Sequence, residues 1–354
     1  MKRSTLLGVA AVLGLSATPA AAQVVKLTGA GATFPNVIYQ NWMLTYNKAN
    51  PGVQLNYQSI GSGGGIRQFS DKTVDFGASD APMSDSAIAA IQGNVLHIPT
   101  VLGAVVVTYN LPGVTQQLKF TPALIADIFL GKLTKWNDAR IAAANPGVRL
   151  PDSDILVVHR SDGSGTTYIW TDYLSKVSPE WKDKVGKGTS VNWPVGLGGR
   201  GNEGVAATVN QSPGAVGYVE LAYASGNRLP YGQVQNRAGV FMSPTLEATT
   251  AAFAAELPSL APTTDFRVSI TDPPGADAYP IASMTYLLLR KTYDDAAKTA
   301  ALIKFIWWAE TDGQAKAAQL GYAPLPQALR PWIADRLSSI TVGGQKVWTA
   351  SAAR

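Results

Sequence analysis

Residues 159–167 contain one histidine, one arginine, one aspartate, two glycines and four hydroxyl side chains. An apolar run over 155–158 predicts a strand before this turn, and residues 166–174 predict a helix after it. The first backbone N–H groups of a helix have no partner within the helix, so they can bind an anion. Arg160 adds a planar fork of donors that matches phosphate or carboxylate, and Asp162 is placed to hold that fork in one orientation. This stretch therefore predicts an oxyanion site.

An isolated Gly-Ser-Gly-Thr turn is more often an ordinary helix start with a surface Arg–Asp pair. Two further glycine-rich turns, at 29–35 and 60–65, favour a binding site, since each follows a strand-like run and precedes a helical one. A third strand-like run, residues 76–79, ends on Asp80. Ligands of open α/β sheets bind at the carboxyl ends of the strands. We therefore expect these turns to meet at one site.

Residues 1–22 are typical of a cleavable signal peptide. Lys2 and Arg3 form its positive end, an apolar stretch follows at 6–15, and three consecutive alanines provide small residues for cleavage. We therefore predict an exported chain whose mature form begins at Gln23. No cysteine follows the cleavage site, which argues against a lipid anchor, and no later apolar run is long enough to cross a bilayer. These features predict a location in the bacterial periplasm.

Composition removes several classes of function. The chain has no cysteine, which excludes disulfides and thiolate metal sites. It has two histidines, His97 and His159, so histidine metal centres and histidine-dependent catalysis have few candidates. The formal charge of +5 is small and dispersed, which argues against nucleic acid as a partner. We expect no metal and no cofactor.

The length of 354 residues, even without the signal peptide, exceeds the roughly 250–300 residues at which a single core stops growing. Two lobes are therefore expected. Residues 98–109 and 279–289 are mostly apolar and long enough to cross between them. Local signals also predict strands at 24–28, 53–57, 191–195 and 215–219, helices at 85–92, 123–130, 203–210 and 296–310, and a helix that starts with a capping box at 311–314.

Residues 196–201 match the dinucleotide-binding pattern G-x-G-x-x-G, with Glu220 near the distance expected for a ribose-binding acid. We reject a nucleotide site there, since Pro194 interrupts the preceding strand and a single match of this kind is weak. A tight loop before a helix is the simpler interpretation.

Asp80 discriminates between oxyanions. A carboxylate that faces an anion is repulsive unless the ligand brings a proton to donate, as both the monobasic and the dibasic form of phosphate do. An unsatisfied pair of acceptors in a dry site costs about 1–3 kcal/mol, and more for charged groups. Asp80 therefore favours phosphate over sulfate, which has no proton at neutral pH. A helix N-cap or an internal salt bridge is the alternative role for this residue.

Five motifs, at residues 28–35, 60–62, 74–82, 160–166 and 214–220, are specific in combination. Together they resemble the periplasmic phosphate-binding proteins of bacterial ABC-type phosphate importers, over almost the whole mature chain. The resemblance implies an α/β, two-lobed type II periplasmic-binding-protein fold with two hinge crossings and a ligand cleft between the lobes. It implies lobe I at 23–105 and 280–354, and lobe II at 106–279.

Carried over position by position, the resemblance implies a phosphate site shared by both lobes. The ligand-binding residues would be Thr33, Phe34 (through its backbone N–H), Ser62 and Asp80 on lobe I, and Arg160, Asp162, Ser164, Gly165 and Thr166 on lobe II. Asp80 would accept the phosphate proton, Asp162 would brace Arg160, and the others would donate. Relatives often carry a second serine where this chain has Gly63, a position that we do not expect to touch the ligand.

The resemblance implies a solute-binding protein, monomeric when soluble, and not an enzyme. Inorganic phosphate would be captured by closure of the lobes and delivered to the membrane permease and ATPase complex of the importer. A secreted phosphatase is an alternative, with Ser62 or Ser164 as nucleophile, but neither serine lies in G-x-S-x-G or near an obvious base. A binding protein for molybdate or sulfate fits the same fold, and Asp80 opposes it. The sequence leaves affinity, the preferred protonation state of phosphate, arsenate discrimination, the permease-docking residues and any role in phosphate sensing undetermined.

Overall fold

The structure is a computed structural model that describes residues 24–261 and 265–350. The predicted signal peptide at 1–22 lies outside the described residues. Among the helices that are described, none has the length and apolar character needed to cross a membrane.

The strands of the main sheet are β1 (Val25–Gly31), β2 (Val53–Ser59), β3 (Phe76–Ser79), β4 (Leu96–Tyr109), β6 (Leu156–Arg160), β7 (Leu197–Gly199), β8 (Ala215–Glu220), β11 (Ala282–Leu289) and β13 (Ala323–Pro324). Two smaller sheets contain β5 (Lys119–Phe120), β9 (Gln233–Gln235) and β10 (Phe241–Met242), and β12 (Thr292–Tyr293), β14 (Thr341–Val342) and β15 (Gln345–Lys346).

The α-helices are α1 (Asn36–Ala49), α2 (Ser62–Ser70), α3 (Asp85–Ala90), α4 (Pro122–Phe129), α5 (Ala139–Ala144), α6 (Gly165–Val177), α7 (Pro179–Lys184), α8 (Gly201–Gln211), α9 (Leu221–Gly226), α10 (Leu246–Glu256), α11 (Ala296–Glu310) and α12 (Arg330–Ser338). Short 3-10 helices are η1 (Leu257–Ser259), η3 (Asp312–Lys316), η4 (Ala318–Leu320) and η5 (Gln327–Leu329).

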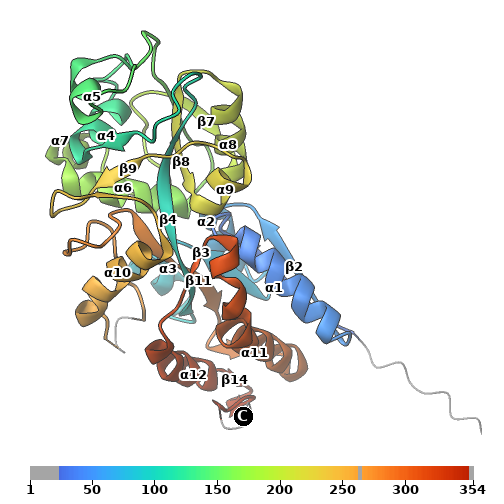
Figure 1. The fold of residues 1–354 in the computed structure, drawn as a ribbon. Coiled ribbons are helices and arrows are strands. Elements are labelled where there is room, and N and C mark those ends of the chain that lie inside the picture. Colours follow the sequence, from blue (N-terminus) through green and yellow to red (C-terminus); the bar gives the residue numbers. More distant parts are fainter. Residues whose placement is uncertain (1–23, 262–264, 351–354) are drawn as a thin grey trace, which may run out of the picture.

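The main sheet passes through both halves of the molecule. Its strand order is β2-β1-β3-β11-β4-β8-β6-β7, and β13 pairs with β4. Figure 1 shows β4 extending from one half to the other, with helices around both halves. We call the half built on β1, β2, β3 and β11 the first lobe, and the half built on β6, β7 and β8 the second lobe. The prediction of an α/β fold with two lobes is confirmed.

β4 joins the two lobes. Its residues are buried along the whole strand. Residues 96–104 pair antiparallel with β11, whereas residues 105–109 pair antiparallel with β8. A strand that is covered on both faces needs an apolar run rather than an alternating pattern. This is why the run at 98–109 already indicated a crossing.

A second connection between the lobes precedes β11. The backbone N–H of Val105 in β4 donates to the carbonyl of Ile281 at 2.9 Å, and the Tyr279 hydroxyl donates to the carbonyl of Val105 at 3.0 Å. Tyr279 and Ile281 are buried. The two crossings therefore lie side by side, as a hinge requires.

The glycine-rich stretch at 196–201 contains a strand and not only a loop. Its residues 197–199 form β7, which pairs parallel with β6, whereas no strand forms at the predicted position, 191–195. A Cβ at Gly199 would lie less than 3.0 Å from the backbone of α8. Glycine therefore lets β7 lie directly against that helix. The local pattern of apolar residues did not reveal the position of this strand.

The predicted capping box at 311–314 does not start an α-helix. Residues 312–316 form the 3-10 helix η3, and Thr311 makes no side-chain cap. Its hydroxyl donates instead to the carbonyls of Trp307 and Trp308, at the end of α11. The prediction was wrong because a threonine hydroxyl can bond backward to the preceding turn as well as forward.

Candidate functional site

The turn between β1 and α1 brings Thr33 and Phe34 to the centre of the molecule, where both are buried. The Phe34 ring packs over Gly103 of β4, where a Cβ would lie less than 3.0 Å from the ring. This side chain belongs to the core. Only the backbone of Phe34 is therefore free of the core packing.

Ser62 is the first residue of α2, so the helix begins within the glycine-rich turn and not after it. Gly61 precedes it with a φ of 87°, which favours glycine. A Cβ at Gly61 would also collide with the carboxylate of Asp162 in the second lobe. The Ser62 hydroxyl accepts from the backbone N–H of Asp80 at 3.1 Å and donates to Asp80 Oδ2 at 3.4 Å.

Asp80 follows β3 and is 1% exposed. The Thr285 hydroxyl of β11 donates to its Oδ1 at 2.7 Å. Burial raises the pKa of Asp80 to about 7, although the Thr285 hydrogen bond, the Arg160 charge and the Ser62 hydrogen bond oppose this rise. A carboxyl with such a pKa can hold or release a proton near neutral pH. Ser84, and not Asp80, is the N-cap of α3, so the alternative role of Asp80 as a helix N-cap does not apply.

Arg160 ends β6 and is 3% exposed. Its Nε and Nη2 donate to the Asp162 carboxylate at 2.8 and 2.5 Å, and its Nη1 donates to the Thr166 hydroxyl at 3.3 Å. Burial acts to raise the pKa of Asp162, but the hydrogen bonds and charge of Arg160 outweigh it and hold that pKa below its usual value. The pair is therefore ionised and fixed in orientation.

Ser164, Gly165 and Thr166 form the start of α6, and all three are buried. The Ser164 oxygen accepts from the backbone N–H of Thr167 at 3.0 Å, which leaves its hydroxyl proton to donate. Gly165 and Thr166 lie in the first turn of the helix, where backbone N–H groups have no acceptor within the helix. The positive end of α6 therefore faces the site.

The two lobes are in direct contact here. The backbone N–H of Gly63 in α2 donates to the carbonyl of Gly163 at 2.8 Å, and a Cβ on Gly63 would lie 3.0 Å from the Gly163 Cα. A Cβ at Gly165 would lie less than 3.0 Å from both Asp80 and Ser62. The structure thus brings all nine predicted residues into one region between closed lobes. Eight of them are buried, and the Asp162 side chain is 13% exposed.

Five polar residues that the sequence argument missed as site residues also lie here: Asn202, Glu220, Tyr223, Thr285 and Tyr322. Tyr223 donates its hydroxyl to the Thr33 carbonyl at 2.5 Å, and Tyr322 donates to the Phe34 carbonyl at 2.7 Å. Both hydroxyls therefore hold the first ligand-facing turn in place. Asn202 lies in the first turn of α8, directly after the glycine-rich stretch, and this position is the one local signal that could have suggested a site residue there. No local signal marks Tyr322 or Thr285 as a site residue.

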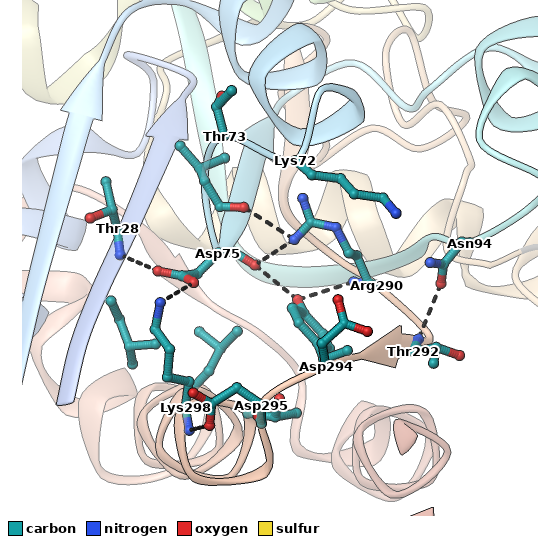
Figure 2. Close-up of a pocket in the computed structure, with 15 residues that line it drawn as sticks. Thr28, Lys72, Thr73, Asp75, Asn94, Arg290, Thr292, Asp294, Asp295 and Lys298 are labelled. Atoms are coloured by element: carbon teal, nitrogen blue, oxygen red, sulfur yellow. Dashed lines mark hydrogen bonds and ion pairs between the residues drawn. The ribbon is translucent and has the colours of Figure 1, made fainter. Parts of the chain in front are cut away.

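A separate pocket of about 530 Å³ lies at the other end of β3, where Asp75 precedes the strand, and no predicted site residue lines it. Figure 2 shows Asp75 and Lys298 bonded to each other and the Arg290 guanidinium bonded to backbone carbonyls. Lys298 donates to the Asp75 carboxylate at 2.8 Å, and the Arg290 guanidinium donates to the carbonyls of Phe69 and Val74. Lys298 and Arg290 thus hold the first lobe together. This distinguishes the pocket from the interlobe site, by which we mean the region between the two lobes where the nine predicted residues lie.

The fold and the site together define a class of protein. Periplasmic binding proteins have two α/β lobes that are joined by two crossings and close on a buried polar site. A family model described as a PBP superfamily domain matches residues 16–310. The phosphate-binding protein PstS of Xylella fastidiosa is 48% identical over 320 residues, which cover 89% of this chain and 86% of that protein. PstS of Pasteurella multocida is 48% identical over 307 residues, which cover 86% of this chain and 88% of that protein.

Solved structures share the fold. One is a high-affinity periplasmic phosphate-binding protein bound with phosphate, with a TM-score of 0.70, 20% identity, and coverage of 91% of this chain and 97% of that one. Another is a phosphate-binding protein from Stenotrophomonas maltophilia, with a TM-score of 0.66 and 20% identity. The match covers 86% of this chain and 92% of that one.

The chain belongs to the PBP superfamily and, within it, to the PstS family of phosphate-binding proteins. The resemblance seen in the sequence and the two-lobed type II fold are thereby confirmed. Membership of this family of binding proteins also confirms the prediction that the chain is not an enzyme.

Proposed function

We propose that this chain is a periplasmic solute-binding protein that captures inorganic phosphate between two closing lobes and delivers it to an ABC-type importer. The observation that carries the proposal is the set of chemical groups that line the interlobe site. A braced guanidinium, several hydroxyls and a helix N-terminus surround one carboxyl, Asp80, whose pKa burial raises to about 7. Such a site suits a small anion that accepts many hydrogen bonds and donates one. The names of the relatives that are 48% identical support the same ligand.

In the proposed complex, the donors on the first lobe are Thr33, Ser62 and the backbone N–H of Phe34. The donors on the second lobe are Arg160, Ser164, Gly165 and Thr166, and Asp162 keeps Arg160 in place. Asp80 accepts the ligand proton. Sulfate lacks that proton, so its oxygen would face the Asp80 oxygen without a hydrogen between them, and binding would weaken accordingly.

The division of the chain follows from the same proposal. Residues 1–22 would be removed on export to the periplasm, residues 23–105 and 280–354 would form lobe I, and residues 106–279 would form lobe II. The ligand stabilises the closed form because it contacts both lobes, so either half-site alone should bind weakly. The closed, monomeric protein would then meet the membrane permease and ATPase complex of the importer.

The contacts of the two histidines oppose the phosphatase alternative. The His159 ring stacks on Trp193 with ring centroids 4.7 Å apart, and burial lowers the pKa of His159. The His97 Nδ1 lies 2.7 Å from a carboxylate oxygen of Asp265. Both rings are therefore occupied elsewhere, whereas a nucleophilic serine needs a base within hydrogen-bond reach.

The test is calorimetric titration of the mature protein after unfolding and refolding to strip bound ligand. Tight one-to-one phosphate binding that excess sulfate does not displace is the expected result. Weak phosphate binding, or an equal response to sulfate, would overturn the proposal and direct the search to other oxyanions or to phosphate esters. Turnover of a phosphate ester by the purified protein would favour the phosphatase.

Gly165→Ala is expected to weaken phosphate binding about 10- to 100-fold by blocking closure, since an added methyl group in a packed contact costs about 1–3 kcal/mol. The methyl group would meet Asp80 and Ser62, which lie on the other lobe, so each lobe can still fold. Gly226→Ala is the matched control on the same lobe, because a Cβ there would meet nothing within 4 Å. Small-angle scattering with and without phosphate measures closure, and a Gly165→Ala protein that closes with full affinity would contradict the prediction.

A further inference from the structure

Asn202 lies between the two lobes and joins two threonines of the proposed site. Its side-chain nitrogen Nδ2 is 2.8 Å from the Thr33 hydroxyl of the first lobe and 3.1 Å from the Thr166 hydroxyl of the second. Its backbone N–H also donates to the Thr33 hydroxyl, at 3.2 Å. Asn202 is fully buried at the start of α8.

The orientation of the Asn202 amide is set by a neighbour. The backbone N–H of Glu220, at the end of β8, donates to Asn202 Oδ1 at 3.1 Å. A backbone N–H can only donate, so the oxygen of the amide must point to Glu220 and the NH2 group must point to the two threonines. Both threonine oxygens are therefore hydrogen-bond acceptors in this contact.

A hydroxyl oxygen has two lone pairs and one proton. The Thr33 oxygen accepts from the backbone N–H and from Nδ2 of Asn202. The Thr166 oxygen accepts from Asn202 Nδ2 and from Arg160 Nη1. Two donors occupy the lone pairs of each oxygen, so each hydroxyl can take part in a further hydrogen bond only as a donor.

We propose that Asn202 is a specificity-determining positioning residue that forces Thr33 and Thr166 to donate to the ligand. The inference rests on the proposed function and deepens it. One asparagine would fix the direction of a hydrogen bond from each lobe, so that the site presents donors to the anion everywhere except at Asp80. A ligand with several accepting oxygens and a single proton fits this arrangement, and the asparagine makes the fit depend on closure, since it contacts both lobes.

The test combines Asn202→Asp with Thr33→Val in a double-mutant cycle read by phosphate titration. The aspartate keeps the shape of asparagine but accepts hydrogen bonds, so both threonine protons turn toward it and away from the ligand. We expect Asn202→Asp to weaken phosphate about 100-fold, as for the loss of two hydrogen bonds to a charged ligand. We expect Thr33→Val to weaken it about tenfold in the wild type but less than about twofold in the Asn202→Asp protein.

The added negative charge is present in both arms of the cycle and cancels in the comparison. Asn210→Asp makes the same change at an exposed position of α8 and should bind phosphate as the wild type does. If Asn202→Asp does not fold, as judged by thermal unfolding, the same cycle with Asn202→Ala replaces it. Alanine offers no acceptor for the Thr33 proton, so the Thr33→Val effect should then shrink, because the hydroxyl is no longer forced to donate, but should not disappear.

Two outcomes would overturn the role of Asn202 while leaving the proposed function intact. In one, the fold-changes in phosphate affinity of the two substitutions simply multiply in the double variant. In the other, the Asn202→Asp protein binds phosphate with wild-type affinity. A wild-type protein that does not bind phosphate would overturn the proposed function itself, and the inference with it. A merely structural asparagine would lower the unfolding temperature without changing how much the Thr33 hydroxyl contributes.

Discussion

Arg160→Ala is expected to weaken phosphate binding by about 100- to 1,000-fold. Arg160 is the cation of the site, is 3% exposed, and is held by two hydrogen bonds to Asp162. Truncating one member of a buried, hydrogen-bonded charge pair costs about 2–5 kcal/mol, because the remaining charge is left without a partner. In this variant Asp162 would face the anion uncompensated, which adds repulsion to the lost attraction. Calorimetric titration with phosphate measures the effect.

Two further variants separate charge from geometry. Arg160→Lys keeps the positive charge but cannot form the planar fork that Asp162 holds, so its affinity should fall between those of Arg160→Ala and the wild type. Arg149→Ala removes an exposed arginine of the same lobe and is the control for net charge, with affinity expected to change less than about twofold at moderate salt. An Arg160→Ala protein that stays within tenfold of wild-type affinity would contradict the proposed site.

Asp80→Asn is expected to strengthen sulfate binding about 10- to 100-fold at pH 8, because it removes a charged acceptor that faces a ligand oxygen. The asparagine can place an N–H where the aspartate has a lone pair, and it fits the same space. The ratio of phosphate to sulfate affinity should therefore fall. Competition titrations at fixed phosphate measure this ratio. An unchanged ratio would refute the role of Asp80 as proton acceptor.

The raised pKa of Asp80 adds a pH signature to this prediction. Because its pKa lies near 7, the protonated form persists up to about that pH and is lost above it. Protonated Asp80 can donate to sulfate, so sulfate binding to the wild type requires the uptake of one proton above pH 7. Wild-type sulfate affinity should fall about tenfold for each pH unit above 7 and level off below it. In Asp80→Asn this dependence should be absent.

Other groups around Asp80 do not mimic this signature. Tyr39 stays neutral, since burial raises its pKa further above the normal tyrosine value. Glu220 is a second buried carboxyl among the described residues whose pKa is affected by Asp80, and burial raises that pKa well above normal. Glu220→Gln separates the two carboxyls: if the pH dependence of sulfate binding survives in that variant, Asp80 is its source.

Several features of the fold were predictable because their signals are local. The apolar run of β4, the glycine-rich turns after β1 and β2, and the Ser164 N-cap of α6 each depend on residues a few positions apart. The pairing of Arg160 with Asp162 spans two positions, so a sequence pattern suffices to suggest it. The same local reasoning misplaced a strand at 191–195 and a helix after 311, where packing against α8 and a backward threonine bond decided the outcome.

The sequence by itself determined which residue types stand at the strand ends, and hence the prediction that the ligand is an anion with a proton. Only the tertiary structure decided what surrounds them. Thr285 reaches Asp80 across 205 residues of chain, Asn202 reaches Thr33 across 169, and Tyr322 reaches Phe34 across 288. No local pattern encodes contacts over such separations. The Thr285 and Tyr322 contacts exist only once the C-terminal part of the chain has returned to the first lobe, and the Asn202 contact exists only where the two lobes meet. The pKa of Asp80 has the same origin, since burial between closed lobes raises it and no neighbour in the chain does.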